Sequence, residues 1–540
     1  MNQITPPGQL DLIPENAPFS PEQRSWLNGF FAGLIAPEAG GVQPLSADAG
    51  AAVMKEASGN GADDDDAPWH DQTLPMAERM KLAEGKPLRR RMMAAMAQQD
   101  CGQCGYNCHD YSNAIAGRKE ARLNLCVPGG KETMRMLKEL AVELDQAPAA
   151  PAASAVQTSA PAAPPAAIAQ PGRSRDNPVL ATFLSRRRLN GAGSEKETWH
   201  VEFDLEAAGL DYVVGDSFGV FATNDLGLVD QIIAVLGASP LTQVNGKTLR
   251  EVLHRDVSLA PAPDSLFELL SFVSGGAVRE KARALAQGAD PDGDAAVLDV
   301  LAALQKFPGI RPHPEAFVEA LEPLQPRLYS ISSSHRATPG RLSLTVDAVR
   351  YVIGKRRRSG LASTFLAERI QPGETLPVYV QRAHGFGLPS DPAVPVIMIG
   401  PGTGIAPFRA FLFDRQATKA PGRNWLFFGH QRSDCDFFYA DELKALKSDG
   451  VLTRLSLAWS RDSDAKFYVQ DRMREVGREL WSWLADGAHV YVCGDAKRMA
   501  RDVERALVDI TAQFGARSTD EAVAYVSGLK KAGRYQQDVY

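Results

Sequence analysis

The stretch PVIMIGPGTGIAPFRAFLFDRQ, residues 395–416, decides the fold of the C-terminal part of this chain. Its apolar opening predicts a buried strand, the glycines at 400, 402 and 404 predict a tight turn, and the following residues have a helical pattern. A glycine-rich turn between a strand and a helix is where a doubly wound parallel sheet binds a dinucleotide. The flanking strand and helix favour this interpretation over an ordinary glycine-rich turn.

The same alternation of strand and helix continues downstream. Apolar segments at 424–429, 454–460 and 489–494 are each followed by a helical pattern, including one at 499–510. This order predicts a parallel sheet flanked by helices over residues 391–540. Upstream, residues 177–390 contain short alternating strands with a mainly helical insert at about 240–322. The sequence therefore predicts a multidomain protein of mixed α+β and α/β class.

Composition bounds the class of protein. The 540 residues have 44% hydrophobic and 23% charged content and a net charge of −6, which is typical of a globular protein and not of a nucleic-acid binder. The sequence contains no run of about 18 apolar residues, so it predicts no membrane-spanning helix. The N-terminus lacks the basic and apolar regions of a signal peptide. The six cysteines are unevenly placed, which favours reduced thiols and a cytoplasmic location over a disulfide framework.

The N-terminal third divides into four segments. Residues 1–45 contain a helical pattern, with Trp26 and Phe30 on its apolar face, that fits a docking helix or ordinary core packing. Residues 46–73 include Asp63–Asp66 and predict a flexible acidic linker. Residues 74–145 hold four cysteines, and residues 146–176 form an Ala/Pro-rich linker.

The four cysteines follow the spacing Cys-x2-Cys-x3-Cys-x17-Cys, at Cys101, Cys104, Cys108 and Cys126. Four thiolates are the usual ligand set of a [4Fe–4S] cluster, whereas a structural zinc site prefers two paired knuckles. Zinc and a role without metal remain as alternatives. The segment resembles the small four-cysteine iron–sulfur domains of electron-transfer subunits in bacterial redox complexes. Their third cysteine comes one residue later, so the local turn differs here.

Two motifs upstream of residue 391 suit a flavin. In the strand Arg327-Leu328-Tyr329-Ser330, the arginine can pair with a pyrophosphate, the tyrosine can stack on the isoalloxazine, and the serine can hydrogen-bond near N5. The stretch Gly360-Leu361-Ala362-Ser363-Thr364 precedes a helix and can present amide N–H groups to a phosphate. Each motif alone is weak evidence for a flavin site.

Residues near the ends of the later predicted strands suit NADPH. Ser460 and Arg461 end one strand and Lys466 follows in the next loop, so two cations and a hydroxyl fit a 2′-phosphate. An NAD site would place an acidic residue there. Cys493 ends the last clear strand within reach of a nicotinamide, and the chain ends in Tyr540, an aromatic that can cover a flavin.

In this order and spacing, the motifs over about residues 177–540 resemble the FAD/NADPH half of the diflavin reductases, within the ferredoxin–NADP reductase superfamily. The strongest likeness is to the flavoprotein (alpha) components of NADPH–sulfite reductases. Tyr212-x-x-Gly215-Asp216 and residues 221–225 also match. The resemblance implies an antiparallel β-barrel FAD domain with a helical connecting insert, followed by a doubly wound parallel NADP domain.

The resemblance also implies residue roles. Ser330, Cys493 and Asp538 would orient the nicotinamide and stabilise charge during hydride transfer. FAD would contact Arg327, Leu328, Tyr329, Ser330, Thr345, Val346, Tyr351, Gly360, Leu361, Ala362, Ser363 and Tyr540. NADP would contact Arg187, Thr403, Ser460, Arg461, Lys466, Tyr468, Gln470 and Asp502. At Asp347 the resembled proteins have a small residue, so no side-chain role carries over.

Diflavin reductases begin with an FMN domain, and we expect none here, because the four-cysteine unit takes its place in chain order. The expected function is an NADPH-dependent flavoprotein oxidoreductase that passes electrons from NADPH through FAD and a [4Fe–4S] cluster to a partner sulfite or nitrite reductase. One alternative is a stand-alone reductase of ferredoxin, flavodoxin or a ferric chelate. Another is an electron donor subunit of assimilatory nitrate reductase, and a third makes the cluster structural or a redox sensor.

Overall fold

The computed structural model describes residues 67–70, 74–99, 104, 106–126, 128–146, 170–383 and 385–540. The expected docking helix within residues 1–45 lies outside the described residues. So do nearly all of the acidic segment 46–73, Cys101 and linker residues 147–169.

A six-stranded antiparallel sheet forms the first part of the chain after residue 177. Its strand order is β6-β3-β10-β1-β2-β7. A bridge between Ile331, which follows β6, and Leu344 of β7 brings the two edges of the sheet together. The strands are β1 (Val179–Arg188), β2 (Thr198–Asp204), β3 (Ser217–Val220), β6 (Arg327–Ser330), β7 (Arg341–Asp347) and β10 (Thr375–Gln381). Phe183, Phe203 and Phe218 are fully buried in its core.

A helical insert with its own apolar core connects β3 to β6. It starts at residue 226, earlier than the expected 240, because Asp225 Oδ1 accepts a hydrogen bond from the Leu228 N–H at 3.0 Å and so caps the first helix. The elements are α7 (Leu226–Leu236), β4 (Gln243–Val244), β5 (Lys247–Thr248), α8 (Leu249–Arg255), α9 (Asp264–Phe272), α10 (Gly276–Ala286), η1 (Ala295–Val297), α11 (Val300–Lys306) and α12 (Pro314–Glu319).

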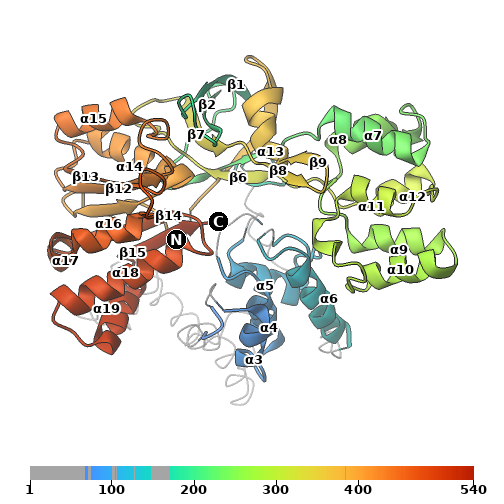
Figure 1. Ribbon diagram of the computed structural model, residues 1–540, viewed down its shortest axis with the longest axis horizontal. Coiled ribbons are helices and arrows are strands. Elements are labelled where there is room, and N and C mark those ends of the chain that lie inside the picture. The colour runs from blue at the N-terminus through green and yellow to red at the C-terminus, as the bar shows by residue number, and fades with distance from the viewer. Residues whose placement is uncertain are drawn as a thin grey trace, which may run out of the picture. The chain divides into compact units, whose positions relative to one another are not determined.

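A five-stranded parallel sheet forms the C-terminal part, in the order β13-β12-β11-β14-β15. Alternate residues of β11 point to opposite faces: Ile397 and Ile399 join one apolar core, and Val396 and Met398 join the other. Figure 1 shows α14 and α15 on one face of the sheet and α16 to α19 on the other. Helices on both faces confirm the prediction of a doubly wound sheet.

The bounds of these elements follow the chain order. The strands are β11 (Val396–Ile399), β12 (Asn424–His430), β13 (Arg454–Trp459), β14 (His489–Gly494) and β15 (Tyr535–Val539). The helices are η3 (Gly402–Ile405), α14 (Ala406–Ala417), α15 (Ala440–Ser448), α16 (Val469–Glu475), α17 (Gly477–Ala485), α18 (Met499–Phe514) and α19 (Thr519–Lys531).

Two smaller groups of elements complete the described chain. The hairpin β8 (Arg350–Ile353) and β9 (Arg356–Ser359) leads into α13 (Leu361–Thr364) and the π-helical turn η2 (Phe365–Arg369). The four-cysteine unit consists of α3 (Met76–Leu82), α4 (Leu88–Ala95), α5 (Cys108–Ala116) and α6 (Gly130–Gln146). Nowhere in the described ranges is there a helix of the length and apolarity that crossing a bilayer requires.

Candidate active site

A cavity of about 430 Å³ lies between the antiparallel sheet, α13 and β15, and we call it the flavin cavity. This volume is within the usual range of small-molecule sites. Ten of the twelve residues expected to contact FAD line it: Arg327, Leu328, Tyr329, Ser330, Thr345, Gly360, Leu361, Ala362, Ser363 and Tyr540. The other two lie elsewhere, because Val346 is buried in the core of the sheet and Tyr351 is half-exposed on β8.

Arg327 has no carboxylate partner among the described residues. Its Nη1 contacts only the carbonyl oxygens of Gln325 and Pro326, at 3.4 and 3.3 Å. Burial lowers the pKa of the guanidinium, as expected for a cation taken out of water without a counter-ion. A pyrophosphate in the cavity would supply the missing negative charge. The residues present therefore fit the phosphates of FAD.

The three expected catalytic residues lie together, and two of them, Ser330 and Asp538, line the flavin cavity. Ser330 Oγ on β6 donates to Oδ2 of Asp538 on β15 at 2.5 Å, and Cys493 Sγ on β14 lies 3.7 Å from the same oxygen. The register of β14 and β15 pairs Cys493 with Asp538, so the parallel sheet itself places the thiol beside the carboxyl group. Burial raises the pKa of Cys493 well above its ordinary value, so the group is a neutral thiol. Burial also raises the pKa of Asp538, against the opposing effect of its two donors.

The position of Gly404 in the turn after β11 requires glycine. A Cβ atom at this position would lie 2.1 Å from the carbonyl oxygen of Cys493. Only glycine permits the turn to approach the end of β14 so closely. The glycine-rich turn at 400–404 therefore also fixes the backbone next to Cys493.

A second cavity of about 470 Å³ lies at the carboxyl ends of β11, β12, β13 and β14, and we call it the nucleotide cavity. This edge of an open α/β sheet is where ligands bind. Four of the residues expected to contact NADP line it: Ser460, Tyr468, Gln470 and Asp502.

The other four expected NADP contacts lie outside this lining. Thr403 lines the flavin cavity instead, where its Oγ1 is 2.7 Å from the hydroxyl of Tyr540. Arg461 forms an ion pair with Glu195. Lys466 is exposed in the loop before α16.

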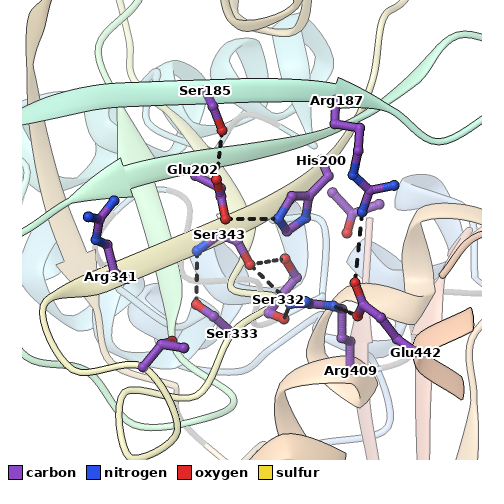
Figure 2. Close-up of polar contacts among 12 residues, drawn as sticks. Ser185, Arg187, His200, Glu202, Ser332, Ser333, Arg341, Ser343, Arg409 and Glu442 are labelled. Atoms are coloured by element: carbon purple, nitrogen blue, oxygen red, sulfur yellow. Dashed lines mark hydrogen bonds and ion pairs between the residues drawn. The ribbon is translucent and has the colours of Figure 1, made fainter. Parts of the chain in front are cut away.

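Arg187 is the fourth, and it belongs to a polar network between the two sheets (Figure 2). Its guanidinium lies 3.8 Å from Glu442 of α15, which also accepts from Arg409 Nε at 2.6 Å. Arg409 of α14 in turn donates to the carbonyl oxygen of Ser332 at 2.7 Å. The network thus joins the parallel sheet's helices to the antiparallel sheet.

The same network reaches the flavin cavity. The hydroxyl of Tyr439 lies 2.7 Å from Thr345 Oγ1 and 3.1 Å from His200 Nδ1. His200 is buried, and burial together with Arg409 lowers its pKa to about 4. His200 is therefore neutral at pH 7. Through the hydroxyl of Tyr439, it helps to hold the Thr345 side chain in place.

Sequence reasoning missed several residues of the nucleotide cavity. Arg498 follows β14 by four residues, and a cation just past a strand end was a usable signal. Lys196 comes from the connection between β1 and β2, in the other sheet, and local sequence carries no signal for it. His430 and Asp495 also line this cavity.

The three described cysteines of the four-cysteine unit face one small cavity. Cys104, Cys108 and Cys126 line it together with Met96, Tyr106, Tyr111 and Pro128. The backbone N–H groups of Ala97 and Gly129 hydrogen-bond to the sulfur of Cys126. The described part of the unit, which omits Cys101, contains no group of three or more His, Cys, Asp or Glu side chains placed to hold a metal ion. Cysteine thiols that line one cavity, one of them with two N–H donors, are part of the donor set that an iron–sulfur cluster uses.

Comparison with known proteins agrees with this geometry. Residues 171–365 match the FAD binding domain family, and residues 398–505 match the oxidoreductase NAD-binding domain family. The chain is 42% identical over 377 residues to the sulfite reductase [NADPH] flavoprotein alpha-component of Escherichia coli K12. It is 43% identical over 371 residues to that of Photorhabdus laumondii. Each match covers 68% of this chain and 61% of the relative.

The chain thus spans about three-fifths of the length of these relatives. Residues 171–365 thus belong to the FAD binding domain family and residues 398–505 to the oxidoreductase NAD-binding domain family, in a chain similar to the sulfite reductase flavoprotein alpha-components.

Proposed function

We propose that this chain oxidises NADPH and passes the electrons through FAD and a [4Fe–4S] cluster to a partner reductase. The observation that carries the proposal is the contact of Ser330 and Cys493 with Asp538, at the wall of a flavin cavity that also includes Thr403 of the dinucleotide turn. One site thus joins a flavin-binding sheet to a nicotinamide-binding sheet.

Bound FAD would accept a hydride and release the electrons one at a time. The chain supplies orientation and charge. Ser330 and Cys493 direct their protons at Asp538, which lies at the nicotinamide end of the cavity in this proposal. Tyr540, held by Thr403, covers the cavity until the nicotinamide takes its place.

NADPH is the proposed donor because of the groups at the nucleotide cavity. Ser460, Gln470 and the cationic Arg498 line it, and Arg461 and Lys466 lie next to it in sequence. Cations and hydroxyls at this place suit a 2′-phosphate. Displacement of Glu195 from Arg461 by the phosphate would bring that guanidinium into the site.

The four-cysteine unit is the proposed one-electron carrier. Cys101, Cys104, Cys108 and Cys126 would hold the [4Fe–4S] cluster, and the shared cavity of the three described cysteines supports this. Residues 74–145 would form the iron–sulfur domain, residues 146–176 a tether, residues 177–390 a barrel-type FAD domain and residues 391–540 the NADP domain. A reducing, cytoplasmic location is part of the proposal, because thiolate ligands require reduced cysteines.

The proposed acceptor is the catalytic chain of a sulfite or nitrite reductase. Its support is the name of the relatives, sulfite reductase flavoprotein alpha-components. The test is reduction of sulfite and of nitrite by NADPH when this chain is mixed with candidate catalytic subunits. Reduction of free ferredoxin or ferric chelate at the same rate without any such subunit would contradict a dedicated partner.

A further inference from the structure

One ion pair joins the flavin cavity to the nucleotide cavity. Asp347 ends β7 and lines the flavin cavity, while Lys196 precedes β2 and lines the nucleotide cavity. The Lys196 ammonium lies 3.8 Å from Oδ2 of Asp347. The two residues therefore place an acid in one site and its counter-ion in the other.

The Asp347 carboxylate is held more firmly than the Lys196 ammonium. Oδ1 of Asp347 accepts a hydrogen bond from Thr198 Oγ1 at 3.1 Å, and Thr198 and Asp347 are directly paired in the β2–β7 register. The Lys196 side chain is 45% exposed and has no other carboxylate within ion-pair distance in the described chain. A flexible four-carbon stem lets such an ammonium exchange partners.

The charge of Asp347 affects how easily a flavin bound in the flavin cavity is reduced. Hydride transfer delivers two electrons and one proton, so a flavin that accepts it gains one negative charge unless a second proton follows. A carboxylate in the cavity wall disfavours that charge, and the Lys196 ammonium offsets the carboxylate. The net effect on flavin reduction therefore depends on where Lys196 is held.

A bound nucleotide brings phosphates to the cavity that Lys196 lines. The ammonium then has a second anionic partner, and its compensation of Asp347 weakens. We propose that the Lys196–Asp347 pair couples nucleotide occupancy to the flavin: bound NADP⁺ draws Lys196 away and makes the reduced flavin less favourable.

This regulation rests on the proposed function, since it needs both FAD and NADP to bind. The coupling would favour electron transfer out of the flavin while the product, NADP⁺, is bound. Coupling between two binding equilibria is reciprocal, so reduction of the flavin must weaken NADP⁺ binding by the same factor. That would speed product release after hydride transfer.

The test measures the ratio of oxidised to reduced flavin in the full FAD-loaded chain, against a reference dye under anaerobic conditions, with and without saturating NADP⁺. In the wild type we expect NADP⁺ to raise this ratio by about threefold to tenfold, where tenfold is about 30 mV for a two-electron couple. Lys196→Met should raise the ratio without nucleotide and cut the NADP⁺ effect to less than half. Asp347→Asn should lower the ratio without nucleotide.

The matched control is a surface pair of the same kind. Asp441 and Lys444 lie 3.5 Å apart on α15 with 101% and 69% exposed side chains, so Lys444→Met should leave every ratio unchanged. A second readout is the dissociation constant of NADP⁺ for the oxidised and the reduced chain, whose quotient should equal the shift in the ratio.

The possible failures are distinguishable. If the wild type binds FAD and NADP⁺ but Lys196→Met and Asp347→Asn behave like Lys444→Met, the coupling is overturned and the proposed function stands. If the chain binds no FAD or no NADP⁺, the proposed function fails and the coupling fails with it. Asp347→Asn keeps the volume of the side chain, so it gives an answer even if Lys196→Met does not fold.

Discussion

The hydroxyl of Ser330 donates a 2.5 Å hydrogen bond to Oδ2 of Asp538, across the boundary between the FAD-binding and NAD-binding sheets. The two residues are 208 positions apart in the chain. Their contact is possible because β6 and β15 both end at the flavin cavity. Charge that develops during hydride transfer would therefore meet groups from both domains.

Replacing Asp538 with Asn tests this arrangement. The change keeps the shape of the group but removes its ionisable carboxyl and puts an NH2 donor in place of one oxygen, and loss of one such preorganised group costs about 10²-fold or more in rate. Stopped-flow measurement of flavin reduction by NADPH would report it, with FAD content as the control for folding. A rate within about threefold of the wild type would show that Asp538 does not stabilise the transition state.

Gly404→Ala tests the close approach of the turn after β11 to β14. The added Cβ would lie 2.1 Å from the carbonyl oxygen of Cys493, so the backbone must move, at a cost of about 1–3 kcal/mol. Urea unfolding measures the loss. Gly528→Ala is the control, because its Cβ would meet nothing within 4 Å, and in the middle of α19 it should stabilise the chain by roughly 0.5–1 kcal/mol. Equal stability of the two variants would contradict the account.

Ser460→Asp tests the recognition of the 2′-phosphate. A carboxylate in the lining of the nucleotide cavity would repel the phosphate and accept from a free 2′-hydroxyl instead. We expect kcat/KM for NADPH to fall about 30-fold or more while that for NADH changes little, since loss of a charge-assisted hydrogen bond costs about 2 kcal/mol or more. Parallel loss with both nucleotides would place Ser460 outside the phosphate site.

The buried His200 makes a prediction about pH. Its pKa is lowered to about 4 in the folded chain by burial and by Arg409, from an ordinary value of about 6.5. Between these values the unfolded chain binds a proton that the folded chain does not, so stability falls as pH drops from about 6.5 to 4. The full effect is about 3 kcal/mol. His200→Gln should show a smaller loss over this range in urea unfolding, and an unchanged pH dependence would contradict the lowered pKa.

The sequence predicted the local parts of this molecule well. The glycine turn at 400–404 and the strands around it follow from apolar runs and turn residues, and the structure confirms them as β11, η3 and α14. The convergence of Ser330, Cys493 and Asp538 came from family resemblance, because no local pattern relates residues so far apart.

What the sequence could not predict depends on contacts between the two sheets. Arg187 on β1 pairs with Glu442 on α15. Lys196 reaches the nucleotide cavity from the other sheet. Each of these placements is set by the packing of one sheet on the other, and spacing along the chain carries no information about it.

The most direct test of the central claim is anaerobic mixing of the FAD- and iron-loaded chain with NADPH in a stopped-flow spectrometer. The account predicts loss of flavin absorbance followed by bleaching of the cluster absorbance, and in Cys108→Ser the first phase should persist while the second disappears. Bleaching of the flavin with no change at the cluster in the wild type would contradict the proposed electron route.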